Sequence, residues 1–329
     1  MMRQILGIGN ALVDVMTMID DDIILKKFAL PKGSMQLVDK AKSELVKSGT
    51  VHCRRSLASG GSAANTIHGL AMLGVKTGFI GSIGKDEMGD FFENDMRNAG
   101  IETMLSRRES VTGTAVALIS TDSERTFATH LGAAVELDVS NLNPTDFNSY
   151  DILYLEGYLI NNKPLVEAAC RIAKERGMMI ALDLASYNVV EVMLMDFQEI
   201  IGKYVDLVFA NEEEARAFSG VETNMALDHI SKSCEVAVVK VGSEGSWIKR
   251  YDEIIKISSD KVRVRDTTGA GDLYASGFLY GYSTGLDLEK CGQIGSLMAG
   301  KVIEIVGARM DKSKFEEIKT KIERIINSD

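Results

Sequence analysis

The sequence predicts an α/β fold: a mostly parallel central sheet flanked by helices, with a small β-sheet inserted beside it. Three observations support this prediction. Short apolar runs alternate with amphipathic helical patterns over the C-terminal two-thirds of the 329 residues. Several β-rich segments of the N-terminal region follow one another without a long helix between the members of each pair. Two glycine-rich turns open apolar helical runs, as in α/β proteins that bind anions.

The N-terminal region predicts one strand of the central sheet, Ile5–Ile8, and the small sheet. Asp122 and Ser123 form a turn signal between the last two β-rich segments. A small sheet beside the carboxyl edge of a larger one can close over a ligand. We therefore expect one domain over residues 1–329, with a lid at about 13–39 and 112–130. The four segments, expected to form a mostly antiparallel sheet, are Val13–Asp20, Ser34–Asp39, Thr112–Thr121 and Glu124–His130.

The remaining elements alternate between helix and strand. The last helix is predicted to begin at Ser313, with Glu316 completing a capping box. Three earlier helices, each followed by a glycine that favours a helix end, are Ser62–Leu73, Asp86–Ala99 and Pro164–Arg176. Ligands of parallel sheets bind at the carboxyl ends of the strands. The inner strands of the predicted sheet are Ile152–Leu155, Met179–Leu182, Val205–Phe209 and Val236–Val239.

The bulk properties limit the class of partner. A net charge of −10 argues against nucleic acid or a membrane surface held by bulk attraction, whereas a small anionic ligand depends on local donors and stays compatible. The chain shows no apolar run of membrane-spanning length and no signal-peptide core. Its four cysteines are scattered without C-x-x-C spacing. We therefore expect a cytoplasmic protein with free thiols, either a monomer or a homodimer.

The most informative segment is Asp266–Asp272, Asp-Thr-Thr-Gly-Ala-Gly-Asp, which an apolar helical run follows at once. A glycine-rich turn that opens a helix directs backbone N–H groups and the positive end of the helix dipole to one point, so it predicts an anion site. Asp272 at this point is suited to take a proton from a hydroxyl that attacks a phosphoryl group. The alternative is that Asp272 merely caps the helix, a position that aspartate favours.

Two other glycine motifs also have competing interpretations. Gly60–Asn65 opens a helix, and Asn65 could bond a substrate hydroxyl, although capping and packing explain the motif about as well. Gly7–Asp14 begins with Gly-x-Gly but lacks the third glycine and the helix of a dinucleotide-binding fingerprint. We expect Asp14 instead to accept hydrogen bonds from two neighbouring sugar hydroxyls.

Asn211–Glu214 follows a predicted strand and opens a helix. Asn is a favoured N-cap and Glu three residues later completes a capping-box-like pair. The same two side chains could help to place a hydrated Mg²⁺ beside phosphates, and the two interpretations are compatible. Gly295–Lys301 looks like a phosphate-binding P-loop, but Val302 replaces the required hydroxyl residue inside an apolar helical pattern. We interpret it as a packing face.

Together these motifs resemble the ribokinase-like (PfkB) family of sugar and nucleoside kinases. Gly60–Asn65, continued through Gly74 to Gly84, is similar to the first family signature, and Asp266–Asp272, continued through Ser276 and Gly277, is similar to the second. Asn211–Glu214 is similar to the Asn-x-x-Glu motif of the family. The resemblance spans nearly the whole chain. It implies a ribokinase-like fold, ATP as phosphoryl donor and Mg²⁺ as cofactor.

The resemblance also implies roles for single residues. Asp272 would be the general base. Asn211 and Glu214 would support Mg²⁺ largely through water, and Asp266 and Thr268 would bind a monovalent cation such as K⁺. The backbone that would bind the transferring phosphate belongs to Gly269, Ala270 and Gly271.

The implied ligand contacts extend to both substrates. The nucleotide would lie beside Lys240, Gly242 and Gly245, although the family often has Thr at the position of Lys240. This difference puts the nucleotide contact at Lys240 in doubt. The residues that would hold the sugar are Asn10, Asp14, Gly60, Gly61 and Asn65.

Three segments resemble the adenosine-kinase branch of the family: Gly9–Asp14, Lys32–Asp39 and Glu124–Gly132. We therefore expect phosphorylation of the primary hydroxyl of a ribofuranosyl nucleoside, adenosine first. The alternative within the family is a kinase of a free sugar such as ribose, fructose or 2-keto-3-deoxygluconate. Two other classes fit the sequence less well: a nucleotide-binding regulator without catalysis, which has no use for Asp272, and an NAD(P)-dependent oxidoreductase, which needs the missing third glycine.

Overall fold

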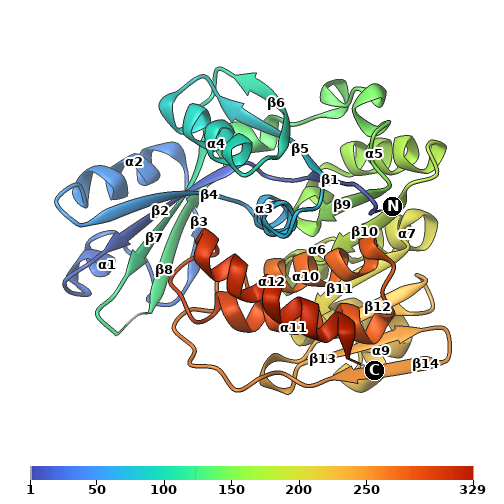
Figure 1. Ribbon diagram of the computed structural model, residues 1–329. Coiled ribbons are helices and arrows are strands. Elements are labelled where there is room, and N and C mark those ends of the chain that lie inside the picture. The colour runs from blue at the N-terminus through green and yellow to red at the C-terminus, as the bar shows by residue number, and fades with distance from the viewer. Residues whose placement is uncertain (1, 123, 329) are drawn as a thin grey trace.

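The computed structural model describes residues 2–122 and 124–328. It consists of a large sheet with helices on both faces and a smaller sheet that projects from one side, at the left of Figure 1. The chain enters the large sheet at β1 and crosses to the small sheet for β2 to β4. It returns to the large sheet for β5 and β6, crosses again for β7 and β8, and then builds the rest of the large sheet. This order confirms the predicted α/β fold with a second small sheet.

The large sheet has nine strands in the order β14-β13-β12-β11-β10-β9-β1-β5-β6. All neighbours from β12 to β6 pair in parallel, and β12, β13 and β14 pair antiparallel at the other edge. The predicted mostly parallel sheet is therefore confirmed. Its strands are β1 (Ile5–Ile8), β5 (Thr77–Gly84), β6 (Glu102–Arg108), β9 (Ile152–Glu156), β10 (Met179–Asp183), β11 (Leu207–Asn211), β12 (Val236–Lys240), β13 (Ser246–Arg250) and β14 (Glu253–Ile257).

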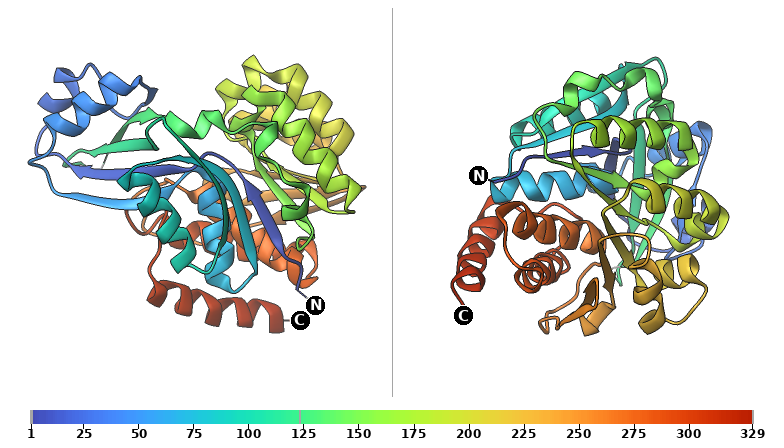
Figure 2. Two further views of the ribbon diagram at one scale, coloured as in Figure 1. Left: turned by 90° about the horizontal axis from the view of Figure 1, so that it is seen from above. Right: turned by 90° about the vertical axis from the view of Figure 1, so that its right-hand side faces the viewer.

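Apolar side chains on the two faces of the large sheet form two separate cores, because strands buried on both faces need a helical layer on each. Figure 2 shows the two layers on opposite sides. One layer contains α5 (Lys163–Glu175), α6 (Tyr187–Val192), α7 (Leu194–Tyr204), α8 (Glu212–Ser219) and α9 (Thr223–Ile230). The other contains α3 (Ser62–Leu73), α4 (Glu87–Asn98), α10 (Ala270–Thr284) and α11 (Leu288–Val302), with α12 (Lys312–Asn327) packed outside α11.

The small sheet has five strands in the order β3-β8-β7-β2-β4, and it is evenly mixed rather than mostly antiparallel as predicted. The reason lies in the large sheet. β2 and β7 follow directly from β1 and β6, which run in the same direction, so β2 and β7 also pair in parallel. The strands are β2 (Leu12–Met18), β3 (Met35–Leu37), β4 (Arg55–Gly60), β7 (Gly113–Ile119) and β8 (Arg125–His130). β4 was not predicted, and the turn predicted at Asp122 and Ser123 includes Ser123, which lies outside the described residues.

Two short helices, α1 (Ile23–Lys27) and α2 (Lys40–Gly49), cover one face of the small sheet. Phe28 and Val46 pack there against Val15, Val116 and Leu118 of the strands. Because successive residues of a strand point to opposite faces, Asp14 and its cross-strand neighbours face the other way. That second face looks towards the carboxyl edge of the large sheet.

Most predicted helix ends are confirmed, and one is wrong. α3 ends at Gly74, whose φ of 97° is the left-handed conformation expected there. The last helix begins one residue earlier than predicted, and Asp311 rather than Ser313 caps it by accepting a hydrogen bond from Lys314 N at 2.8 Å. The P-loop-like Gly295–Lys301 lies inside α11, as expected of a packing face. Across the described ranges, no helix is both long enough and apolar enough to cross a membrane.

Candidate active site

A cavity of about 1770 Å³ lies between the two sheets. The small sheet contributes Asp14 and Leu37 to its lining, and the large sheet contributes the carboxyl ends of its strands. The Gly-Ala-Gly turn before α10 completes it. The structure thus brings together the motifs that the sequence singled out, although they are spread over most of the chain.

Four neighbouring parallel strands end in a polar residue at this cavity: Glu156 on β9, Asp183 on β10, Asn211 on β11 and Lys240 on β12. Asp183 is in register with Glu156, and Asn211 with Lys240. Asn211 and Lys240 were predicted site residues. Glu156 and Asp183 were not, because the two strands that they end were expected to stop one residue earlier. The sequence signal that could have identified Glu156 and Asp183 is a carboxylate directly after an apolar run.

The Gly-Ala-Gly turn caps α10 through backbone geometry alone. Gly269 is the N-cap residue with a φ of 76°, and a Cβ there would lie 2.5 Å from that of Ala308, so glycine is required. The N–H groups of the first helical turn have no partner inside the helix, which supports the predicted anion site. The Ala270 N–H donates to the Thr267 carbonyl at 3.1 Å, so Gly269 and Gly271 are the better candidates for direct contact.

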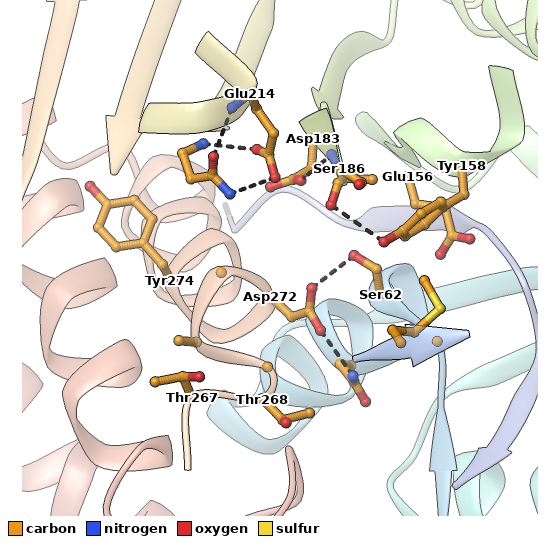
Figure 3. Close-up of a pocket in the computed structure, with 18 of the residues that line it drawn as sticks. Ser62, Glu156, Tyr158, Asp183, Ser186, Glu214, Thr267, Thr268, Asp272 and Tyr274 are labelled. Carbon is orange, nitrogen blue, oxygen red and sulfur yellow. Dashed lines mark hydrogen bonds between the residues drawn. The ribbon is translucent and has the colours of Figure 1, made fainter. Parts of the chain in front are cut away.

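Asp272 does not cap α10; its carboxylate points across to α3 (Figure 3). Ser62 Oγ donates to Oδ1 at 2.7 Å, and Asn65 Nδ2 donates to Oδ2 at 2.9 Å. Burial raises the pKa of Asp272 to about 6, and the two hydrogen bonds act in the opposite direction. The Asn65 amide N–H group thus holds Asp272, and the predicted contact of Asn65 with substrate stays a prediction. The contact of Ser62 with Asp272 was not predicted.

Asp14 lies on β2 directly over the first glycine loop. A Cβ on Gly60 would lie 2.4 Å from Oδ1 of Asp14, so only glycine leaves room for the carboxylate. Gly61 has a φ of 101°, and a Cβ there would lie 2.1 Å from the Asn10 carbonyl. Burial raises the pKa of Asp14 to about 6; Arg309 lowers it and Asp272 raises it. The two carboxylates therefore face the same cavity and influence each other.

Glu156 joins three segments at the floor of the cavity. Its carboxylate accepts hydrogen bonds from the Asn10 N–H and the Ala63 N–H, both at 2.9 Å, and from the Asn10 side chain. Burial raises its pKa to about 7. Glu156 thereby fixes Asn10 and the start of α3, the helix whose side chains donate hydrogen bonds to Asp272.

Asn211 and Glu214 form the predicted capping box. The Asn211 N–H and Nδ2 donate to the two Glu214 oxygens at 2.8 and 2.7 Å, and the Glu214 N–H donates to Asn211 Oδ1 at 2.8 Å. Burial raises the pKa of Glu214 to about 7. Each carboxylate oxygen keeps a free lone pair, which fits contact with a hydrated Mg²⁺. Among the described residues no cluster of three or more His, Cys, Asp or Glu side chains could hold a metal by itself.

The predicted nucleotide side of the cavity begins at the end of β12. Gly242 and Gly245 both line the cavity. Gly245 has a φ of 100°, and a Cβ there would lie 1.9 Å from the Ile257 carbonyl, so the tight turn requires glycine. Lys240 Nζ donates to Asp183 Oδ2 at 2.9 Å. Burial alone would lower the pKa of Lys240, but Asp183 and Glu214 raise it above its usual value, so the side chain is a cation.

At the predicted monovalent-cation site, Asp266 and Thr268 both contact a cationic side chain of the protein. Arg125 on β8 forms an ion pair with Asp266 Oδ2 at 2.7 Å and donates to Thr268 Oγ1 at 3.0 Å. The Thr268 N–H and Gly307 N–H donate to the two Asp266 oxygens at 3.0 and 2.6 Å. N–H groups therefore bond both Asp266 oxygens, which leaves Asp266 little capacity to bind K⁺, and the monovalent-cation site stays a prediction.

Comparison with known proteins agrees with this geometry. Residues 34–314 match the model of the pfkB family of carbohydrate kinases. The chain is 31% identical over 251 residues to an uncharacterized sugar kinase of Archaeoglobus fulgidus, covering 73% of this chain and 96% of the relative. Two crystal structures are each 34% identical and cover 98% of this chain. They are a probable sugar kinase from Rhizobium etli, with a TM-score of 0.89 over 99% of that chain, and an adenosine kinase from Sinorhizobium meliloti, with a TM-score of 0.88 over 100% of that chain. The chain therefore belongs to the pfkB carbohydrate kinase family and is an ATP-dependent phosphotransferase that acts on a sugar or a nucleoside.

Proposed function

We propose that this kinase phosphorylates the primary hydroxyl of a ribofuranosyl nucleoside, adenosine first, and converts adenosine and ATP to AMP and ADP. The observation that carries the proposal is an apolar surface beside Asp14 on the cavity face of the small sheet. The surface consists of Met35 and Leu37 on β3 and Phe127 on β8, all of which line the cavity. We call it the lid platform.

The lid platform shares a face of the small sheet with Asp14, the carboxylate proposed to bind the sugar, and two strands separate β3 from β2. One row across the sheet runs Leu37, Thr129, Ala115, Asp14, and the adjacent row runs Met35, Phe127, Ala117, Met16. Met35 is 50% exposed and Leu37 is 65% exposed, although both face a cavity. A nucleoside would place its ribose diol at Asp14 and cover this apolar surface with its base. A free sugar has no base and would leave most of this surface uncovered.

The remaining residues supply the chemistry of phosphoryl transfer. Asp272 accepts the proton of the primary hydroxyl while the hydroxyl oxygen bonds to the γ-phosphorus of ATP and the bond to the β–γ bridging oxygen breaks. The Gly269 and Gly271 N–H groups stabilise the charge on the transferring group. Mg²⁺ bound with ATP would neutralise phosphate charge, with Asn211 and Glu214 supporting its water ligands. The small sheet, as a lid, would exclude water during the transfer.

Among the similar proteins, the Sinorhizobium meliloti enzyme is described as an adenosine kinase, which supports the proposal. The Archaeoglobus and Rhizobium relatives are described as sugar kinases, so a free-sugar kinase is the alternative.

The test is kcat/KM for adenosine, inosine, ribose, fructose and 2-keto-3-deoxygluconate with ATP–Mg²⁺, in the wild type and in Leu37→Ser. We expect adenosine to be preferred, and Leu37→Ser to lower kcat/KM for adenosine without lowering it for ribose. Ile23→Ser is the matched control, since Ile23 is 68% exposed on α1, which covers the opposite face of the sheet. A preference for a free sugar, or an equal effect of Leu37→Ser on all acceptors, would reject the nucleoside proposal.

A further inference from the structure

Lys240 is a largely buried charged residue of the cavity for which the roles above give no explanation. It ends β12, and its ammonium lies among the carboxylates of Asp183, Glu214 and Asp272, all of which act on its charge. The Lys240 side chain is 15% exposed and that of Asp183 is 7% exposed. Burial of the Lys240 ammonium costs free energy because the charge is removed from water, so a functional role would explain why it is buried here.

The position of the ammonium relates it to the anion-binding turn. A Cβ built on Gly271 would lie 3.1 Å from Lys240 Nζ, so the ammonium is adjacent to the second glycine of the turn. Figure 3 shows Asp183 and Asp272 on either side of the space in front of this turn. The group bound by the turn therefore also lies within reach of Lys240.

The hydrogen bonds of Lys240 leave it able to bind a further anion. An ammonium has three donors, and among the described residues its one acceptor is Asp183 Oδ2 at 2.9 Å. Asp183 is itself fixed, because its other oxygen accepts from the Ala185 N–H at 2.9 Å. Lys240 therefore has a fixed partner on one side and free donors towards the cavity.

Charge balance favours the same conclusion. The lining contains the carboxylates of Asp183, Glu214 and Asp272, which repel an incoming triphosphate. Of the described residues in the lining, the lysines are Lys240 and the exposed Lys261. A buried Lys–Asp pair adds little stability compared with apolar side chains, so stability alone is a poor explanation for it.

We propose that Lys240 is a catalytic residue that contacts the transferring phosphoryl group of ATP, with Asp183 as the partner that holds its ammonium beside the Gly269–Gly271 turn. The proposal rests on the assignment of this turn and Asp272 as the phosphoryl-transfer site. As the γ-phosphorus leaves the β–γ bridging oxygen for the acceptor oxygen, Lys240 donates hydrogen bonds to its peripheral oxygens, and its own proton count does not change.

The test compares Lys240→Met, Lys240→Arg and Asp183→Asn with the wild type. We expect Lys240→Met to lower kcat by about 10²–10³-fold, as for loss of one donor to a transition-state oxyanion. By calorimetry, it should weaken binding of the ATP analogue AMP-PNP with Mg²⁺ more than binding of ADP with Mg²⁺. Nucleoside affinity should stay unchanged, and Lys240→Arg should recover part of kcat. Lys249→Met is the matched control, because Lys249, on the neighbouring strand β13, pairs with Asp228 of α9 and does not line the cavity.

Asp183→Asn separates a catalytic role from a structural one. If Lys240 acts on the phosphoryl group, the Asp183→Asn variant keeps the Lys240 ammonium, and its kcat should fall less than that of Lys240→Met. If the pair is only structural, both variants lose stability alike in thermal unfolding and neither discriminates AMP-PNP from ADP. That result, or wild-type kcat in a folded Lys240→Met protein, would overturn the proposal. A wild type without turnover on any acceptor would instead point to failure of the proposed substrate.

Discussion

Asn65 Nδ2 donates a hydrogen bond to Asp272 Oδ2 at 2.9 Å, although 207 residues separate the two in the chain. With the hydroxyl of Ser62, it attaches the first turn of α3 to the first turn of α10. The two glycine motifs therefore form one structural unit, in which α3 orients the carboxylate that α10 carries. A base held by two donors has a defined position relative to the anion-binding turn, as proton transfer requires.

Replacement of the proposed base should remove activity without unfolding the protein. We expect Asp272→Asn to lower kcat by about 10²–10⁴-fold. The folded protein raises the pKa of Asp272 to about 6, so it favours the protonated carboxyl. This contribution to stability is fully present below the pKa of the unfolded chain and is lost as pH rises through 6. The neutral variant should thus melt at the same or a higher temperature at pH 7. Near-normal turnover, measured by ADP release, would exclude the general-base role.

The pH dependence of kcat/KM should follow the same carboxylate. A base must be ionised, so the pKa of about 6 in the ligand-free protein predicts that kcat/KM falls as pH drops through this value rather than near the usual range of aspartate. Asn65→Ala removes a donor that favours the ionised form, so it should move this acid limb to higher pH. Ser62→Ala should act in the same direction. An acid limb that stays in place in both variants would show that another group controls it.

Loss of Asp14 should weaken acceptor binding selectively. We expect Asp14→Ala to raise KM for the nucleoside by about 10–100-fold, the value of hydrogen bonds to one charged group. KM for ATP should change little, because Asp14 belongs to the small sheet while ATP is assigned to the edge of the large one. Initial rates over both substrate concentrations measure the two constants. Equal effects on both would remove Asp14 from the acceptor site.

The Arg125–Asp266 pair predicts that the enzyme does not need a monovalent cation. Replacement of K⁺ by tetramethylammonium should leave kcat and KM for ATP unchanged in the wild type. Arg125→Gln should raise KM for ATP, because it leaves Asp266, buried at the start of the glycine turn, without its cation. Low concentrations of guanidinium should restore part of the loss. Strong activation of the wild type by K⁺ would contradict this account of the contacts.

Much of the fold follows from local patterns in the sequence. Strands such as Ile152–Glu156 are continuous apolar runs, and helices such as α3 end where a glycine stands, so period and turn chemistry suffice to place them. Local sequence patterns could not predict the parallel pairing of β2 with β7. It depends on the direction of β1 and β6, which only the assembled large sheet defines.

The sequence predicted several residues of the candidate site, but not the hydrogen-bond and ion-pair partners of those residues. The motifs identified Asp272, Asp14 and the glycine loops, because each has a recognisable local chemistry. The hydrogen bonds from Ser62 and Asn65 to Asp272 join distant helices, and no local pattern reveals them. Arg125 was missed for the same reason, since its partner Asp266 lies on another layer of the fold.

The most direct measurement is a competition in one tube. The enzyme would receive ATP–Mg²⁺ and equal concentrations of adenosine, ribose, fructose and 2-keto-3-deoxygluconate, and the phosphorylated products would be identified by mass spectrometry at low conversion. Nucleoside recognition by Asp14 and the lid platform predicts AMP as the dominant product, absent with Asp272→Asn. A sugar phosphate formed while adenosine remains intact would contradict the nucleoside assignment.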